Sequence, residues 1–248
     1  VIEDTASRRG AALIEVSRDY RYQALSHSLD GQNFLVWRAD EQSQMDAYRE
    51  HYPRSGWEPV RLSLPLLGKH QIDNAVTAYA ALQAARQAGL RISTEAIQKG
   101  FAGVEWPGRF EVMNRDPLLI VDSAHNPDSA AKLRQALDDY LPGMPVILLF
   151  GASEDKDVWG MFQELIPRVE RVIATQSVHP RAMEAEKIVE LAQRLGCPAK
   201  AVLPFEAALQ TALSEAGGRS AVIAAGSLFI AAAARHAWLI QAEQHRSS

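Results

Sequence analysis

The sequence lacks several features that mark large classes of protein. Its 248 residues include one cysteine, Cys197, so an intrachain disulfide is impossible and a reducing compartment is favoured. No run of about 18 apolar residues indicates a membrane-spanning helix, and no basic-then-apolar leader opens the chain. The formal net charge of −4 gives no general attraction to nucleic acid or to anionic membranes. We therefore expect a cytoplasmic protein without nucleic-acid or membrane partners.

Two common nucleotide-binding motifs are missing as well. No G-x-G-x-x-G segment follows the predicted strand at 118–121, which disfavours a dinucleotide-dependent oxidoreductase. No G-x-x-x-x-G-K-[ST] segment occurs either: Gly68-Lys69 comes closest, but Ser63 and His70 stand at the other required positions. The sequence therefore contains no P-loop that could cradle a triphosphate, and no Cys/His spacing typical of a structural zinc site.

What is present is typical of a globular protein with two regions. Hydrophobic residues make up 47% of the chain and charged residues 23%, an ordinary balance for a folded protein. In residues 1–103, the segments 20–26 and 34–38 are predicted to pair as a hairpin around Asp30-Gly31. A helix is predicted between Gly68 and Gly89. Further strands are expected at 11–16 and 61–67, a second helix at 93–100, and a surface excursion at 40–57.

Residues 104–248 alternate more strictly between apolar runs and helical patterns. Strands are predicted at 118–121, 146–150, 171–174, 199–203 and 221–224, with a helix after each. These runs show no polar alternation, as expected for strands that are buried on both faces. Strict strand–helix alternation favours parallel strands joined by right-handed crossovers. We therefore predict an α/β fold with a Rossmann-like, open, mainly parallel sheet and helices on both of its faces.

The loops that follow these strands carry most of the chemically active side chains. In open parallel sheets, ligands bind outside the carboxyl ends of the strands. The loops at that edge are rich in Asp, His, Ser, Lys and Arg, whereas the loops at 142–143, 196–197 and 217–218 are plain. The sequence therefore predicts a site at the edge formed by residues 122–126, 151–157, 176–181 and 226–227.

Each candidate residue has a functional and a structural interpretation. Asp122 ends a buried strand, where it could accept a hydrogen bond from a ribose hydroxyl or merely cap local backbone. His125 could contact a phosphate or carboxylate, or be an ordinary loop histidine. Asn126 precedes Pro127, the pattern of a helix N-cap followed by proline.

Three further positions leave the same choice open. Arg109 could clamp a nucleotide or anchor a linker. His70 and Asn74, four residues apart on one helix face, could contact a ligand or form a solvated surface. The segment Asp155-Lys156-Asp157 could be part of the site, or be no more than a helix N-cap with its counter-charge.

Five segments together carry a family resemblance. They are, in chain order, L-G-K-H-Q-I-D-N-A at 67–75, W-P-G-R-F-E at 106–111, D-S-A-H-N-P at 122–127, G-A-S-E-D-K-D at 151–157 and G-S-L-F at 226–229. In this order and spacing the chain resembles the folylpolyglutamate synthase/dihydrofolate synthase family of the Mur ligase superfamily. One departure is Ser123, where the family pattern has glycine.

The resemblance implies an activity, cofactors and site residues. Members join the amine of L-glutamate to a carboxylate of dihydropteroate or folate, using ATP and Mg²⁺, through an acyl phosphate. By residue-wise carry-over, Asn74, Arg109 and Asp122 are expected to contact ATP, with Asp122 on the ribose. His125 is expected to act near the transferring phosphate or the incoming glutamate, as catalytic or substrate-binding residue. Ser227 is a further expected glutamate contact.

The resemblance also predicts how the chain is organised. Residues 1–103 would be the C-terminal end of a central ATPase-type α/β domain, and residues 104–248 the C-terminal Rossmann-like ligase domain. The P-loop, the metal ligands and a carbamylated lysine of the family would precede Val1, so this chain alone is expected to be inactive. A monomer is expected.

Two alternatives stay open at this point. The chain could belong to a Mur-type ligase of cell-wall precursors, or be a non-catalytic nucleotide-binding module. The choice between dihydropteroate, folates or both as acceptor is also open.

Overall fold

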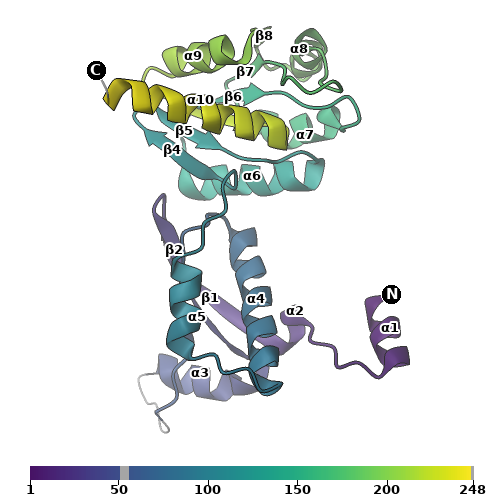
Figure 1. Ribbon diagram of the computed structural model, residues 1–248, viewed down its shortest axis with the longest axis vertical. Coiled ribbons are helices and arrows are strands. Elements are labelled where there is room, and N and C mark those ends of the chain that lie inside the picture. The colour runs from purple at the N-terminus through teal and green to yellow at the C-terminus, as the bar shows by residue number, and fades with distance from the viewer. Residues whose placement is uncertain (51–55, 247–248) are drawn as a thin grey trace. The chain divides into compact units, whose positions relative to one another are not determined.

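The computed structural model describes residues 1–50 and 56–246 and divides into two compact units (Figure 1). Unit 1 comprises Val1–Pro65 and Lys69–Glu105, and unit 2 comprises Leu66–Gly68 and Trp106–Ser248. The division between Glu105 and Trp106 lies two residues after the predicted boundary between 103 and 104.

Unit 1 contains a small antiparallel sheet and several helices. The predicted hairpin is confirmed: Ser28 pairs with Gly31 across a tight turn, and Tyr20 pairs with Arg38 at the far end. The strands lie in the order β1-β2-β3. Their bounds are β1 Tyr20–Ser28, β2 Gly31–Arg38 and β3 Val60–Leu64, and the helices are α1 Ile2–Arg9, α2 Val16–Asp19, η1 Ala39–Glu41, α3 Gln42–Arg49, α4 Lys69–Gln87 and α5 Thr94–Ala102.

Two predictions for unit 1 are wrong. Residues 11–15 form no strand, and the chain turns into the short helix α2. The Asp19 carboxylate accepts the Glu15 N–H at 2.8 Å, and the Asp19 N–H donates to the Glu15 carbonyl at 2.7 Å, so local hydrogen bonds close this helical turn. The segment 40–57 is more than a surface excursion, since α3 buries Met45 against Leu35 and Trp37 of β2. Pro53, one basis of that prediction, lies outside the described residues.

Unit 2 contains a six-stranded sheet in the order β4-β5-β9-β6-β7-β8. All pairs are parallel except β4 with β5, which is antiparallel. The predicted strands are all present, and their bounds are β5 Leu118–Val121, β6 Val146–Phe150, β7 Arg171–Ala174, β8 Ala199–Ala201 and β9 Ala221–Ala225. The edge strand β4, Glu111–Arg115, was not predicted, because it is polar and a bulge between Val112 and Asn114 breaks its alternation.

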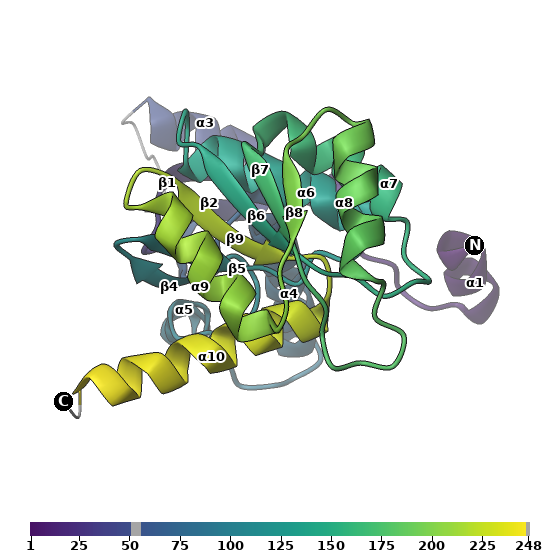
Figure 2. The ribbon, with the colours of Figure 1, turned by 90° about the horizontal axis from the view of Figure 1, so that it is seen from above.

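Helices cover both faces of this sheet, as predicted. Figure 2 shows α9 and α10 on one face and α6, α7 and α8 on the other. The predicted Rossmann-like α/β fold is therefore confirmed for unit 2. The bounds of the helices are α6 Pro127–Tyr140, α7 Val158–Leu165, η2 Ile166–Arg168, α8 Ala185–Arg194, α9 Phe205–Ala216 and α10 Leu228–Arg246.

Burial explains why the strands of unit 2 could be identified from the sequence. Every residue of β5, β6 and β9 is buried, so these strands contain only apolar residues. Within the described part of the chain, no helix combines the length and the apolar character needed to cross a bilayer.

Backbone hydrogen bonds join the carboxyl ends of β5, β9 and β6. The Gly226 N–H donates to the Ala124 carbonyl at 3.0 Å, and the Gly151 N–H donates to the Ala225 carbonyl at 3.4 Å. Gly226 has a φ of 110°, and a Cβ placed on it would lie 2.5 Å from the Gly151 carbonyl oxygen and 2.8 Å from a ring carbon of Phe150. Only glycine fits this junction without displacing its neighbours.

We predict that Gly226→Ala destabilises unit 2 by about 2–4 kcal/mol, because the change adds left-handed strain to overpacking. Gly143→Ala is the matched control: Gly143 also has a positive φ, of 74°, but no atom lies within 4 Å of its added Cβ. The control should therefore cost only the strain, about 1–2 kcal/mol. Urea unfolding followed by circular dichroism measures both values, and equal losses would show that the junction tolerates a methyl group.

Candidate functional site

The strand order of unit 2 creates a switch point at the predicted edge. Strand β9 lies between β5 and β6, and the helix that follows β9 covers the opposite face from the helices that follow β5 and β6. Chains that leave neighbouring strands in opposite directions open a crevice, which is where open α/β sheets bind ligands. Backbone hydrogen bonds from Gly226 to Ala124 and from Gly151 to Ala225 place the loops 122–126, 226–227 and 151–157 next to one another at this edge.

Asp122 holds two segments of backbone at the end of β5. Its Oδ2 accepts the Phe110 N–H at 2.8 Å, and its Oδ1 accepts the Ala124 N–H at 2.7 Å. Desolvation raises the pKa of this carboxyl, while the two backbone donors, the Arg109 guanidinium and His125 oppose that shift. The capping interpretation of Asp122 is therefore correct as a structural role. Each carboxylate oxygen keeps a further lone pair for a ligand hydroxyl.

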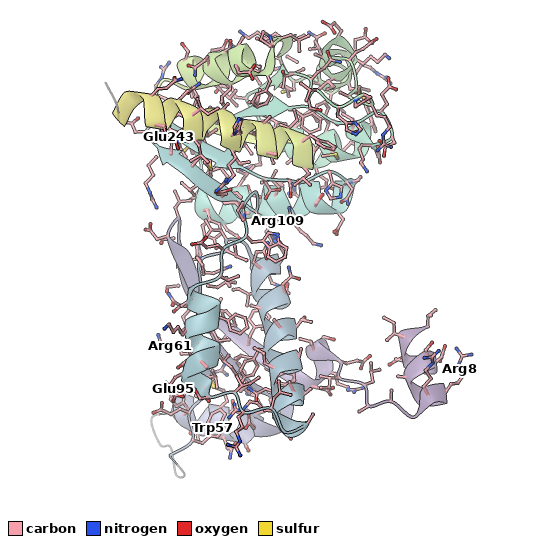
Figure 3. All side chains as sticks on the ribbon, viewed as in Figure 1. Arg8, Trp57, Arg61, Glu95, Arg109 and Glu243 are labelled. Atoms are coloured by element: carbon pink, nitrogen blue, oxygen red, sulfur yellow. The ribbon has the colours of Figure 1, made fainter. Side chains whose placement is uncertain are left out.

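Arg109 lies on a tight turn that is hydrogen-bonded to Asp122 and Ser123 at the end of β5. The Ser123 N–H donates to the Gly108 carbonyl at 2.9 Å. Gly108 has a φ of 73° and Phe110 a φ of 42°, so two left-handed residues flank the arginine. Arg109, labelled in Figure 3, is half-buried. Among the described residues, its guanidinium makes one hydrogen bond, a 3.4 Å contact with the Gly108 carbonyl. The side chain therefore retains donors for a ligand.

His125 is exposed, and hydrogen bonds fix the orientation of both its backbone N–H and its imidazole ring. The His125 N–H donates to Ser129 Oγ at 3.0 Å. Its Nδ1 lies 2.9 Å from the Ser123 carbonyl oxygen. A carbonyl oxygen only accepts, so Nδ1 is the donor in this contact, and Nε2 is left for a ligand. The sequence could not predict this ring orientation, because it depends on the conformation of the loop.

Three helices begin at this edge, and each has a polar cap. Asn126 accepts the Ser129 N–H at 2.8 Å and caps α6, as the Asn-Pro pattern predicted. Asp157 caps α7 by accepting the Gly160 N–H at 2.8 Å, which confirms the N-cap interpretation of 155–157. Ser227 is buried, and its Oγ accepts the Ile230 N–H at 3.1 Å in the first turn of α10. The positive ends of three helix dipoles therefore face the edge.

Asn74 belongs to unit 1 and is described with that unit. It is exposed on α4, where its Nδ2 donates to Gln71 Oε1 at 3.3 Å, and Gln71 also contacts His70 at 3.1 Å. The other predicted residues, Arg109, Asp122, His125 and Ser227, all belong to unit 2 and border its carboxyl edge.

Sequence reasoning missed several contacts that shape the edge. The loop after β7 is tied to the loop after β6 by a bridge between Ser153 and Ala182, and His179 stacks on Phe229 with ring centroids 4.4 Å apart. Ser123 Oγ and Thr175 Oγ1 are buried without a hydrogen-bond partner among the described residues. Buried hydroxyls rarely stay unpaired. The hydroxyls of Ser123 and Thr175 are therefore available for hydrogen bonds beyond those that hold the fold.

Metal ligation is not evident in the described residues. Ranges 1–50 and 56–246 contain no group of three or more His, Cys, Asp or Glu side chains arranged to hold a metal ion.

Comparisons with known proteins agree with this geometry. Residues 108–228 match the family model described as Mur ligase, glutamate ligase domain. The chain is 35% identical over 180 residues to a probable bifunctional folylpolyglutamate synthase/dihydropteroate synthase of Halobacterium salinarum, covering 72% of this chain and 21% of that protein. It is 32% identical over 189 residues to the dihydrofolate synthase/folylpolyglutamate synthase of Mycobacterium tuberculosis, covering 69% and 39%.

A solved structure extends the likeness to both units. Folylpolyglutamate synthase of Mycobacterium tuberculosis, complexed with ADP, superposes with a TM-score of 0.78 at 26% identity, covering 96% of this chain and 51% of that one. The chain thus spans about half the length of this structure and less of the two curated relatives. Residues 108–228 thus match the model of a Mur ligase glutamate ligase domain, and the chain is similar to folylpolyglutamate synthases and dihydrofolate synthases, the resemblance that the five motifs predicted.

Proposed function

We propose that this chain is part of an ATP-dependent ligase that adds L-glutamate to dihydropteroate or to folyl substrates. The observation that carries the proposal is the convergence of Arg109, Asp122, His125 and Ser227 on one edge of unit 2, at the switch point where α/β sheets bind ligands. The relatives are named for this activity, and the solved one was complexed with ADP.

The chemistry requires activation of a carboxylate. Transfer of the γ-phosphoryl group of ATP to a carboxylate oxygen releases ADP and forms an acyl phosphate. The glutamate amine then attacks the acyl carbon, the tetrahedral intermediate expels phosphate, and the amine loses a proton. Positioning and charge neutralisation dominate such steps.

Each residue of the edge has a role in this proposal. Arg109 supplies a cation beside the phosphates, and Asp122 accepts a hydrogen bond from the ribose. His125 and Ser227 face glutamate or the transferring phosphate, with His125 able to offer Nε2 as an acceptor or, when protonated, as a donor. Asn74 is proposed as a further ATP contact from unit 1. We assign no step to Mg²⁺ on these residues, since the described part of the chain offers no ligand cluster for it.

One alternative has a specific observation behind it. The sequence contains no P-loop, which favours a module that binds nucleotide without catalysis. The cell-wall alternative has less support, because the relatives reported above are named for folate chemistry.

A titration with ADP tests the proposed nucleotide site directly. ADP should shift the NMR signals of backbone amides at 108–110, 122–125 and 226–227. The loops at 142–143, 196–197 and 217–218, at the other edge of the sheet, are the internal control. Shifts confined to the control loops, or no shifts at all, would contradict the proposed site. We expect a millimolar or weaker Kd, a binding free energy of about −4 kcal/mol or less favourable.

We predict that Asp122→Asn weakens ADP binding about tenfold, the effect of one charge-assisted hydrogen bond. The variant should also lose about 1–3 kcal/mol of stability, because an amide NH₂ would face one of two backbone N–H donors. Asp128→Asn, an exposed carboxylate in the first turn of α6, is the matched control. A destabilised Asp122→Asn chain that binds ADP normally would leave Asp122 with its capping role alone.

We predict opposite effects for the two neighbours His125 and Asn126. Asn126→Ala should lower the free energy of unfolding by about 1 kcal/mol, since α6 loses its N-cap. His125→Ala should leave stability nearly unchanged, because the ring is exposed, and should weaken binding of ADP or glutamate. Thermal unfolding and NMR titration of both variants decide the matter, and the reverse pattern would refute both roles.

We predict that the purified chain has no ligase activity by itself. Phosphoryl transfer needs donors along the β- and γ-phosphates and a divalent metal, and the sequence provides no P-loop to supply them. The assay measures phosphate release from ATP and Mg²⁺ with L-glutamate and either dihydropteroate or tetrahydrofolate, against reactions without the acceptor. Acceptor-dependent turnover by a preparation free of other ligases would disprove this expectation.

A further inference from the structure

The turn that carries Arg109 has a second anchor, independent of Asp122. Glu111, the first residue of β4, uses both of its carboxylate oxygens. Its Oε2 accepts the Gly108 N–H at 2.8 Å, and its Oε1 accepts Arg235 Nε at 3.0 Å. A single carboxylate thus joins the turn, the edge strand and the long helix α10.

This arrangement fixes Arg109 from both sides. Before the arginine, Gly108 is held through its N–H by Glu111 and through its carbonyl by Ser123. After it, the Phe110 N–H is held by Asp122. A residue between two fixed, left-handed neighbours has little freedom in its backbone, so the direction of its side chain depends on those anchors.

Arg235 is placed to control the Glu111 anchor. The two side chains are partly buried, with relative exposures of 39% for Arg235 and 24% for Glu111. Without the guanidinium, the Glu111 carboxylate would lose its partner at Oε1 and gain rotational freedom. Hydration of the unpaired charge would then favour rotamers that point toward water and away from Gly108. Arg235 is also part of the helix that begins at Ser227, so the same helix that borders the edge supports the turn.

We propose that Glu111 and Arg235 are positioning residues that orient Arg109 for a nucleotide phosphate, with α10 as the rigid support. The proposal rests on the nucleotide site proposed above. It adds two residues that do not themselves contact the ligand, and it differs from a surface ion pair, which would contribute only to stability.

A double-mutant cycle on ADP affinity separates these roles. Arg235→Met removes the guanidinium but keeps an apolar stem, and Arg109→Ala removes the proposed phosphate contact. We expect Arg235→Met to weaken ADP binding three- to tenfold in the wild-type background. In the Arg109→Ala background it should cause no further loss, because its effect acts through Arg109.

Two more variants control for stability. Arg134→Met removes a comparable ion pair, with Glu164 at 3.2 Å, between α6 and α7. It should leave ADP affinity unchanged. The exchange of charges in Glu111→Arg/Arg235→Glu restores an ion pair, but Arg cannot accept the Gly108 N–H. It should recover only the part of the thermal midpoint that the ion pair contributes, without recovering ADP affinity.

The outcomes distinguish the two proposals. Non-additive loss of ADP affinity, with no rescue by the charge exchange, supports the positioning role. This inference alone is overturned if the Arg235→Met variant binds ADP like the wild type. It is also overturned if Arg235→Met reduces ADP affinity by the same factor with and without Arg109. A wild-type chain whose edge amides do not respond to ADP overturns the nucleotide site and this inference with it.

Discussion

The candidate site depends on how one carboxylate satisfies backbone donors at the end of a buried strand. Asp122 follows four buried residues of β5, in a place where an ionised group is costly unless it is hydrogen bonded. By accepting the N–H groups of Phe110 and Ala124, it fastens the turn before β4 and the loop before α6 to one point. Arg109 and His125 extend from these two segments, so their separation is set by that interaction.

The close approach of three strand ends is the second constraint. Gly226 and Gly151 allow β9 to end against its neighbours, since a Cβ at either position would lie within 3 Å of backbone or side-chain atoms. This packing leaves little room for side chains at the junction itself. The groups available to a ligand therefore come from the surrounding loops and from the helix starts capped by Asn126, Asp157 and Ser227.

These two constraints produce an edge suited to anions. Three helix N-termini direct partial positive charge toward it, and Arg109 adds a guanidinium that forms no salt bridge with the described residues of the chain. Asp122 is the carboxylate that directly follows β5, and Glu154, Asp155 and Asp157 lie in the loop after β6. Phosphate and carboxylate groups are the ligands that helix N-termini and a guanidinium favour in general.

Local patterns in the sequence determined much of this molecule. The turn at Asp30-Gly31, the buried apolar strands of unit 2 and the Asn126-Pro127 helix start each depend on neighbouring residues, and each was predicted correctly. Two predictions failed for different reasons. The predicted strand at 11–16 gives way to α2, whose first turn is closed by local Glu15–Asp19 hydrogen bonds. Residues 42–49 form a packed helix because Met45 is buried against Leu35 and Trp37, a long-range contact. The polar strand β4 was missed because it exists through its pairing with β5.

Tertiary structure alone decided the strand order and the geometry of the edge. The insertion of β9 between β5 and β6 brings Ser227 beside a loop about a hundred residues earlier in the chain, and no local pattern encodes that neighbour. The sequence identified Arg109, Asp122 and His125 by residue type and position. It could not show that Glu111 and Arg235, 124 residues apart, meet at 3.0 Å, because a side-chain contact of that range follows from the packing of a helix on a sheet.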